Sequence, residues 1–216
     1  MKTHTSLILL AAVAALLTGC STLGYKKAQD TSSSLRETAQ SIDDSIPPLD
    51  AVLVALDNLV KTPNQNLIDQ YQSYRSALAN LGSSIGTINS RAQDMQLLGD
   101  AYFLNWEGEL AKIQNYEIAT DSRDRKTLVS KKFSALSEKY VSLNKSLTPF
   151  MSDLTDIRTA LGTDLTEKGL KSVEGVLKKS TREGARIRDS LTNLSADFRN
   201  LGMEMESSSS VADTAR

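Results

Sequence analysis

Cys20 is the only cysteine of the chain, and it closes the segment Leu17-Thr18-Gly19-Cys20 at the end of an apolar stretch. Met1–His4 gives a short, positively charged start, and positions 7–17 are an unbroken run of Leu, Ile, Val and Ala. This order is typical of a secretory signal. The run is shorter than the roughly 20 apolar residues that a transmembrane helix needs. The sequence therefore predicts export to an oxidising compartment, where a lone thiol has no disulfide partner within its own chain.

The four residues that end in Cys20 resemble the lipobox of bacterial lipoproteins. The resemblance implies attachment of a diacylglycerol to the Cys20 sulfur, cleavage between Gly19 and Cys20, and acylation of the new N-terminus, for example with palmitate. Two or more acyl chains anchor a protein stably to a membrane. Ser21 follows in place of an aspartate, which by resemblance to enterobacterial sorting favours the outer membrane over the inner one. The alternative is an ordinary signal peptide followed by a chance cysteine.

Few other side chains could support catalysis. His4 is the sole histidine and would leave with the signal, so the mature chain could form neither a histidine-dependent triad nor a His/Cys zinc site. The paired carboxylates Asp43/Asp44 and Glu107/Glu109 are one or two residues apart, and such neighbours point to different sides of a helix. We therefore expect surface charge at these pairs, no catalytic or metal-binding residues, no cofactor and no small-molecule substrate. The protein is expected not to be an enzyme.

An aromatic segment ending in Trp-Glu-Gly-Glu-Leu is the best candidate for a binding site. Tyr102, Trp106 and Leu110 follow one another at helical spacing, and a rigid aromatic cluster can anchor a partner protein. The alternative is that these side chains simply fill the core. A second helix running from about 63 to 119 would exceed its neighbours in length and leave an unpaired end near Trp106.

Hydrophobic periodicity is the strongest structural signal in the sequence. Apolar residues alternate steps of four and three in four long series, and a narrow stripe of this period is typical of coiled-coil packing. The series begin at Leu35, Leu67, Val129 and Val173. The sequence therefore predicts an all-α fold, an elongated antiparallel helical bundle or coiled-coil hairpin of about four helices.

Turn and capping signals divide the chain. Short connections are expected near 61–66, 120–124 and 162–165, and short links favour antiparallel neighbours. The capping box Ser34-Leu35-Arg36-Glu37 suggests that the first helix begins there. The predicted segments are a signal peptide at 1–19, a tether at 20–34, a helical domain at 35–203 and a disordered tail at 204–216.

Prolines interrupt two of the stripes. Proline in a helix interior removes a backbone hydrogen bond and clashes with the preceding turn, at a cost of about 3 kcal/mol or more. We expect Pro47-Pro48 to split the first segment into two helices, with a kink in one continuous helix as the alternative. Pro149 is expected to kink the third helix without ending it, because the stripe continues beyond it.

These features together resemble a known family. The lipobox, the segment Trp106-Glu107-Gly108-Glu109-Leu110 after a long heptad helix, Tyr116, and the charged stretch 121–126 before two further helices are similar to the domain-of-unknown-function 2959 family of bacterial lipoproteins. The resemblance implies a helical cell-envelope protein with no established activity and covers most of the mature chain. Pro47-Pro48 departs from the unbroken early helix that the family would lead us to expect.

The sequence thus predicts a lipid-anchored protein of the bacterial envelope that faces the periplasm. The expected role is non-enzymatic: a structural or protein-interaction role exerted through long coiled-coil helices, with another envelope protein or a second copy as partner. A periplasmic chaperone or carrier that holds clients between its helices is the alternative. The formal net charge of −1 gives no reason to expect nucleic-acid binding.

Overall fold

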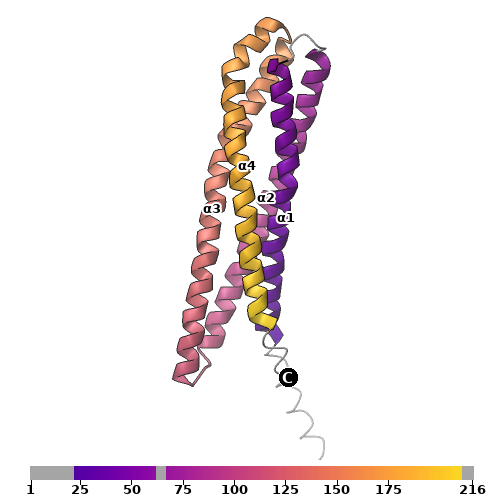
Figure 1. The fold of residues 1–216 in the computed structure, drawn as a ribbon. Coiled ribbons are helices and arrows are strands. Elements are labelled where there is room, and N and C mark those ends of the chain that lie inside the picture. Colours follow the sequence, from indigo (N-terminus) through magenta and orange to yellow (C-terminus); the bar gives the residue numbers. More distant parts are fainter. Residues whose placement is uncertain (1–21, 62–66, 211–216) are drawn as a thin grey trace, which may run out of the picture.

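The described part of the chain is four long helices (Figure 1). The computed structural model describes residues 22–61 and 67–210, and the side chains of 24–61 and 67–206 within them. The helices are α1 (Thr22–Lys61), α2 (Leu67–Leu110), α3 (Tyr116–Thr163) and α4 (Glu167–Ser210). At 1.5 Å per residue, the 44 residues of α2 extend for about 66 Å. The prediction of an elongated all-α bundle is confirmed.

The helices run alternately up and down, so that sequence neighbours are antiparallel (Figure 1). Helix α1 packs between α2 and α4, and α3 closes the bundle by packing against the same two helices from the other side. The beginning of α1, the turn between α2 and α3 and the end of α4 therefore lie at one end of the rod, which we call the base. The opposite, far end holds the end of α1, the beginning of α2 and the connection between α3 and α4.

Helix α1 is the most deeply packed element. Its seam follows alternating steps of four and three, and all of its members are at most 1% exposed: Thr31, Leu35, Thr38, Ile42, Ser45, Leu49, Val52, Leu56 and Leu59. The apolar series of the sequence includes only every second member. It omits the hydroxyl residues, which do not register as apolar, and it also omits Val52 and Leu59, because it steps one residue further at those positions. The Thr31, Thr38 and Ser45 hydroxyls are satisfied locally, because each donates to a carbonyl three or four residues earlier at 2.6–2.8 Å.

The expected tether is wrong for its described part, because α1 begins at Thr22 rather than near Leu35. Small residues bring this first stretch close to its neighbours. Ala28 is buried, and the Ser32 hydroxyl donates to the Gly202 carbonyl of α4 at 2.7 Å. Because these contacts bury few large apolar groups, hydropathy alone gave no sign of them.

The expected break at Pro47-Pro48 is also wrong. Helix α1 continues through both prolines as one helix of 40 residues. Ser45 before the prolines is 1% exposed and Leu49 after them is fully buried, so the packed seam continues on both sides. Tertiary packing thus offsets the two lost backbone bonds. Helix α3 likewise continues through Pro149, as expected.

Two helix ends also differ from the expectation. Helix α2 ends at Leu110, and the turn to α3 occupies 111–115 rather than 120–124. The Asn115 side chain caps α3 by accepting a hydrogen bond from the Ile118 amide at 3.1 Å, and the sequence analysis did not identify this cap. Helix α4 continues into the expected disordered tail, where Met205 is 4% exposed. The connection at 164–166 lies close to the expected place.

Candidate functional site

The predicted aromatic site lies where α2 meets α3 near the base. The Tyr102 ring lies 5.2 Å from the Phe103 ring and 5.4 Å from the Trp106 ring, measured between centroids. Phe103 in turn meets Phe133 of α3 edge-on at 5.5 Å. Such tilted and edge-on contacts are favourable arrangements of aromatic pairs. The cluster of Tyr102, Phe103, Trp106 and Phe133 therefore joins two helices, and we call it the aromatic joint.

Trp106 and Leu110 are held by their own chain. The Trp106 indole Nε1 donates to the Ser122 hydroxyl of α3 at 3.0 Å, and the Arg125 guanidinium lies 5.9 Å above the Trp106 ring. Leu110 is only 4% exposed. Burial also raises the pKa of Tyr102 above its usual range, although nearby Arg125 opposes the shift.

The expected unpaired end of α2 is wrong, because α3, with 48 residues, is longer than α2 with 44 and pairs with its end. The turn after Leu110 comes nine residues earlier than the predicted end at 119. Contact of a partner with Tyr102, Trp106 and Leu110 stays a prediction.

A ladder of ion pairs that the sequence patterns did not predict crosses the α3–α4 seam. Lys132 pairs with Glu204 and Lys139 pairs with Asp197, both at 2.6 Å. Seven residues separate the two lysines on α3, and seven separate the two acids on α4, so successive rungs lie two helical turns apart. The sequence does contain a sign of this ladder. Lysines recur at heptad spacing in the third series, acids recur at heptad spacing in the fourth, and the two series were expected to run antiparallel.

The ladder is interrupted two turns further along. Ser146 takes the next heptad position on α3 and Ser190 takes it on α4, and these short side chains do not bridge the seam. Beyond these serines an ion pair again joins the two helices, where Lys179 of α4 contacts Asp153 of α3 at 2.8 Å. This hydrogen bond to Asp153 raises the pKa of Lys179.

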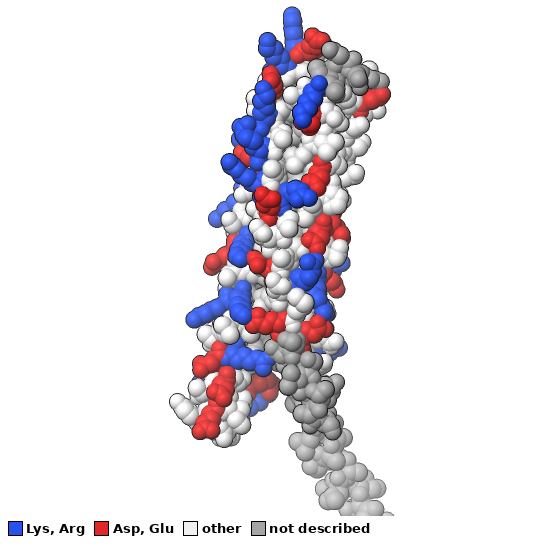
Figure 2. Space-filling model, in the orientation of Figure 1, with Lys and Arg blue, Asp and Glu red and all other residues white. Residues whose placement is uncertain are grey.

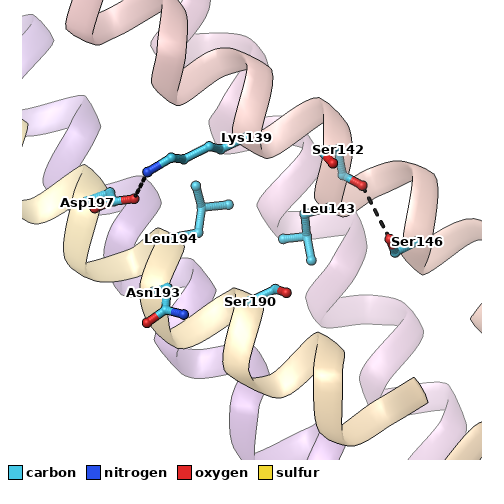
Figure 3. A pocket seen from close by; sticks show the side chains of 8 residues that line it. All are labelled: Lys139, Ser142, Leu143, Ser146, Ser190, Asn193, Leu194 and Asp197. Carbon is cyan, nitrogen blue, oxygen red and sulfur yellow. Dashed lines mark hydrogen bonds and ion pairs between the residues drawn. The ribbon is translucent and has the colours of Figure 1, made fainter. Parts of the chain in front are cut away.

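A hollow opens at the interruption, and we call it the α3–α4 groove (Figure 3). Its volume is about 350 Å³, and Leu143 and Leu194 form its apolar floor. Ser142, Ser146, Ser190 and Asn193 supply hydroxyl and amide groups, and the Lys139–Asp197 pair closes the end nearer the base. A second hollow of about 260 Å³ continues past that pair toward the base, over Leu136 and Leu201.

The paired carboxylates lie outside this groove and are engaged elsewhere. Asp43 pairs with Arg199 at 2.5 Å, whereas Asp44 accepts a hydrogen bond from Gln40. Glu107 pairs with Lys126, which lowers the pKa of that carboxyl. The two members of each pair thus have different partners, as expected for surface charge.

Charges of both signs are interspersed along the rod (Figure 2). Many belong to ion pairs between helices, such as Arg188 with Asp50 at 2.8 Å and Arg91 with Glu37 at 3.0 Å. No group of three or more potential metal ligands comes together within 22–61 and 67–210. None of the helices there has an apolar stretch long enough to cross a bilayer. Gly19 and Cys20 lie outside the described residues.

Comparison with known proteins identifies the family of the chain. The model of the family described as a protein of unknown function, DUF2959, matches residues 18–215. No curated protein and no solved structure shows significant similarity to the chain. The matched stretch contains all four helices, the aromatic joint and the α3–α4 groove. The chain therefore belongs to the DUF2959 family of proteins of unknown function.

Proposed function

We propose that this protein is a lipid-anchored bacterial envelope protein with a non-enzymatic, protein-binding role. The anchor would be Cys20, and the four-helix rod would face the periplasm. Two features support this placement. The lipobox-like segment ends at Cys20, and α1 begins only two residues later, so the rod follows the proposed anchor with almost no spacer.

The α3–α4 groove carries the proposed binding role. Specific interfaces combine an apolar centre with a polar rim. The groove has leucines at its floor, hydroxyl and amide groups on its walls, and an ion pair at one end. A partner helix could place apolar side chains over Leu143 and Leu194 and form hydrogen bonds with Ser190 and Asn193.

The heptad ladder indicates why a partner would bind at this position. Elsewhere along the seam, long lysine side chains cross from one helix to the other and pair with acids. At Ser146 and Ser190 no side chain crosses the seam, so a hollow stays open above Leu143 and Leu194 without any rearrangement of the backbone. A preorganised surface of this kind lowers the cost of binding.

Photocrosslinking in living cells tests the binding role. Benzoylphenylalanine at Ser190, on the groove wall, should capture one discrete partner. The same residue at Val141, which is 51% exposed on α3 and does not line the groove, is the control. Equal capture from both positions, or none from Ser190, would refute binding in the groove. A series of unrelated adducts from Ser190 would favour the chaperone or carrier role instead.

The anchor is tested separately by metabolic labelling. Radiolabelled palmitate should enter the wild-type chain but not a Cys20→Ser variant, and the labelled protein should fractionate with membranes. A wild-type chain that takes up no label would refute the lipid anchor and leave the groove experiment unaffected.

A further inference from the structure

The three most exposed large apolar side chains of the described residues lie in the half of the rod nearer the base, whereas Val54 and Ile68, each 59% exposed, lie toward the far end. Tyr116 is 81% exposed, Leu104 is 75% exposed and Leu97 is 69% exposed. Ile118, at 57%, lies one residue beyond Glu117 on the first turn of α3. Leu104, Tyr116 and Ile118 flank the turn between α2 and α3, and we call residues 104–118 the α2–α3 tip. Exposed apolar side chains at one end of a molecule can mark an interaction surface.

The α2–α3 tip lies at the level at which the chain would enter a membrane. Gly24 of α1 lies beside Asn105 of α2, whose Nδ2 would be 3.7 Å from a Cβ at position 24. From Asn105, α2 continues for five residues to Leu110, about 7.5 Å at the helical rise. Cys20 is four residues before Gly24, a separation that spans at most about 14 Å. The described start of α1 at Thr22 and the turn after Leu110 therefore lie at the same end of the rod, within reach of a membrane that holds an acylated Cys20.

Three of the four charged residues of the α2–α3 tip are paired. Glu107 pairs with Lys126, and Glu109 pairs with Lys112 at 2.7 Å, whereas Glu117 is exposed on the first turn of α3. Tyrosine favours the interface between lipid headgroups and acyl chains, because its ring is apolar and its hydroxyl is polar. Tyr116 thus has a suitable side chain at the most exposed apolar position.

We propose that the α2–α3 tip is a second membrane contact. Leu104, Tyr116 and Ile118 enter the interfacial region of the bilayer that holds the acylated Cys20, and the rod stands upright on its base. This inference rests on the proposed lipid anchor. A single point of attachment would let the rod tilt freely, whereas two points at the base fix its direction and hold the α3–α4 groove away from the lipid.

Tryptophan quenching can test the contact because Trp106 is the only tryptophan of the chain. The double variant Trp106→Phe/Tyr116→Trp moves the fluorophore to the α2–α3 tip. Residues 20–216, which include every described residue, are coupled through the Cys20 thiol to a maleimide lipid in phosphatidylcholine vesicles with brominated acyl chains. Bromine quenches only nearby indoles, so we expect at least twofold stronger quenching than in Trp106→Phe/Ile68→Trp. Ile68 is the matched control, because it is 59% exposed and lies at the far end.

Equal quenching of the two variants would overturn the proposal. Protection of the α2–α3 tip from hydrogen exchange by a second copy of the chain, in the absence of vesicles, would overturn it as well. Because the maleimide supplies the anchor, the quenching result does not depend on whether cells acylate Cys20. Palmitate labelling tests acylation of Cys20 separately. Hydrogen exchange of the unaltered chain is a second measurement in case Trp106→Phe disturbs the aromatic joint. Vesicles should slow exchange at 104–118 by severalfold and leave 67–80 unchanged, and unchanged exchange at 104–118 would also overturn the proposal.

Discussion

Gly99 of α2 lies directly against the ring of Phe133 of α3, so that a methyl group on Gly99 would overlap the ring. Both residues are buried, and the same Phe133 ring meets Phe103 edge-on. The glycine thus sets the spacing between α2 and α3 just above the aromatic joint. Removing the space would force either the ring or the helix to move.

Gly99→Ala should therefore destabilise the bundle, although alanine is the better helix former. Overpacking a filled core costs about 1–3 kcal/mol. Gly86→Ala on the same helix is the control, because nothing lies within 4 Å of a Cβ there, and it should stabilise by roughly 0.5–1 kcal/mol. Urea unfolding of both variants measures the difference. Stabilisation by Gly99→Ala would show that the helices separate readily at this point.

Two buried serines of α4 should respond to alanine in opposite ways. The Ser180 hydroxyl is fully buried and has no hydrogen-bond partner among the described residues, whereas the Ser195 hydroxyl donates to the Ala39 carbonyl of α1 at 3.1 Å. An unsatisfied buried polar group costs about 1–3 kcal/mol, and a satisfied one contributes about 1 kcal/mol. Thermal unfolding should show a higher midpoint for Ser180→Ala and a lower one for Ser195→Ala. The same direction of change in both variants would contradict this assignment.

Much of the fold could be predicted because large apolar residues dominate three of the four seams. The stripes of α2, α3 and α4 contain leucines and aromatic residues that occupy the core as expected. The seam of α1 was predicted only in part. Val52 and Leu59 are apolar but lie one residue before the expected steps, whereas Thr31, Thr38 and Ser45 are polar residues that can be buried because their hydroxyls bond to their own helix. Sequence patterns count such residues as surface.

The candidate sites were harder to predict than the fold. The aromatic cluster stood out by composition, but its pairing with α3 depends on the turn at 111–115, which Asn115 sets through a single cap. The α3–α4 groove arises where Ser146 and Ser190 stand in place of long charged side chains, and its existence depends on the register between two helices. Core packing along the whole rod sets that register. Local sequence patterns do not contain this information.

The stability of the bundle should fall above pH 10, in part because of Tyr74. Burial raises the pKa of Tyr74 well above its usual range, and its hydroxyl donates to the Leu154 carbonyl of α3 at 2.5 Å. Below about pH 10 the hydroxyl is protonated in both folded and unfolded chains, so the full stabilisation is present. Above that pH only the unfolded chain releases the proton, and the free energy of unfolding decreases by up to about 1.4 kcal/mol per pH unit for each such group.

Tyr74→Phe should accordingly lower stability by about 1 kcal/mol at neutral pH, the value of one hydrogen bond, and flatten the decline above pH 10. Urea unfolding at several values between pH 7 and pH 11.5 measures both effects. Tyr102 and Tyr140, whose pKa values are raised mainly by burial, remain in the variant, so part of the decline should persist. Parallel profiles for the variant and the wild type would show that Tyr74 ionises alike in both states.

Replacing the two prolines of α1 should stabilise the protein, because they occupy a helix that forms in spite of them. Each proline removes a backbone donor from the interior of α1, at about 3 kcal/mol or more, although it also restricts the unfolded chain by about 0.4–1 kcal/mol. Pro47 is exposed and Pro48 is partly exposed, so alanine at these positions costs little packing. Pro47→Ala/Pro48→Ala should therefore raise the thermal midpoint and slow hydrogen exchange of the amides around Leu49. A lower midpoint would mean that the prolines impose a bend on which the fit of Leu49 and Val52 into the seam depends.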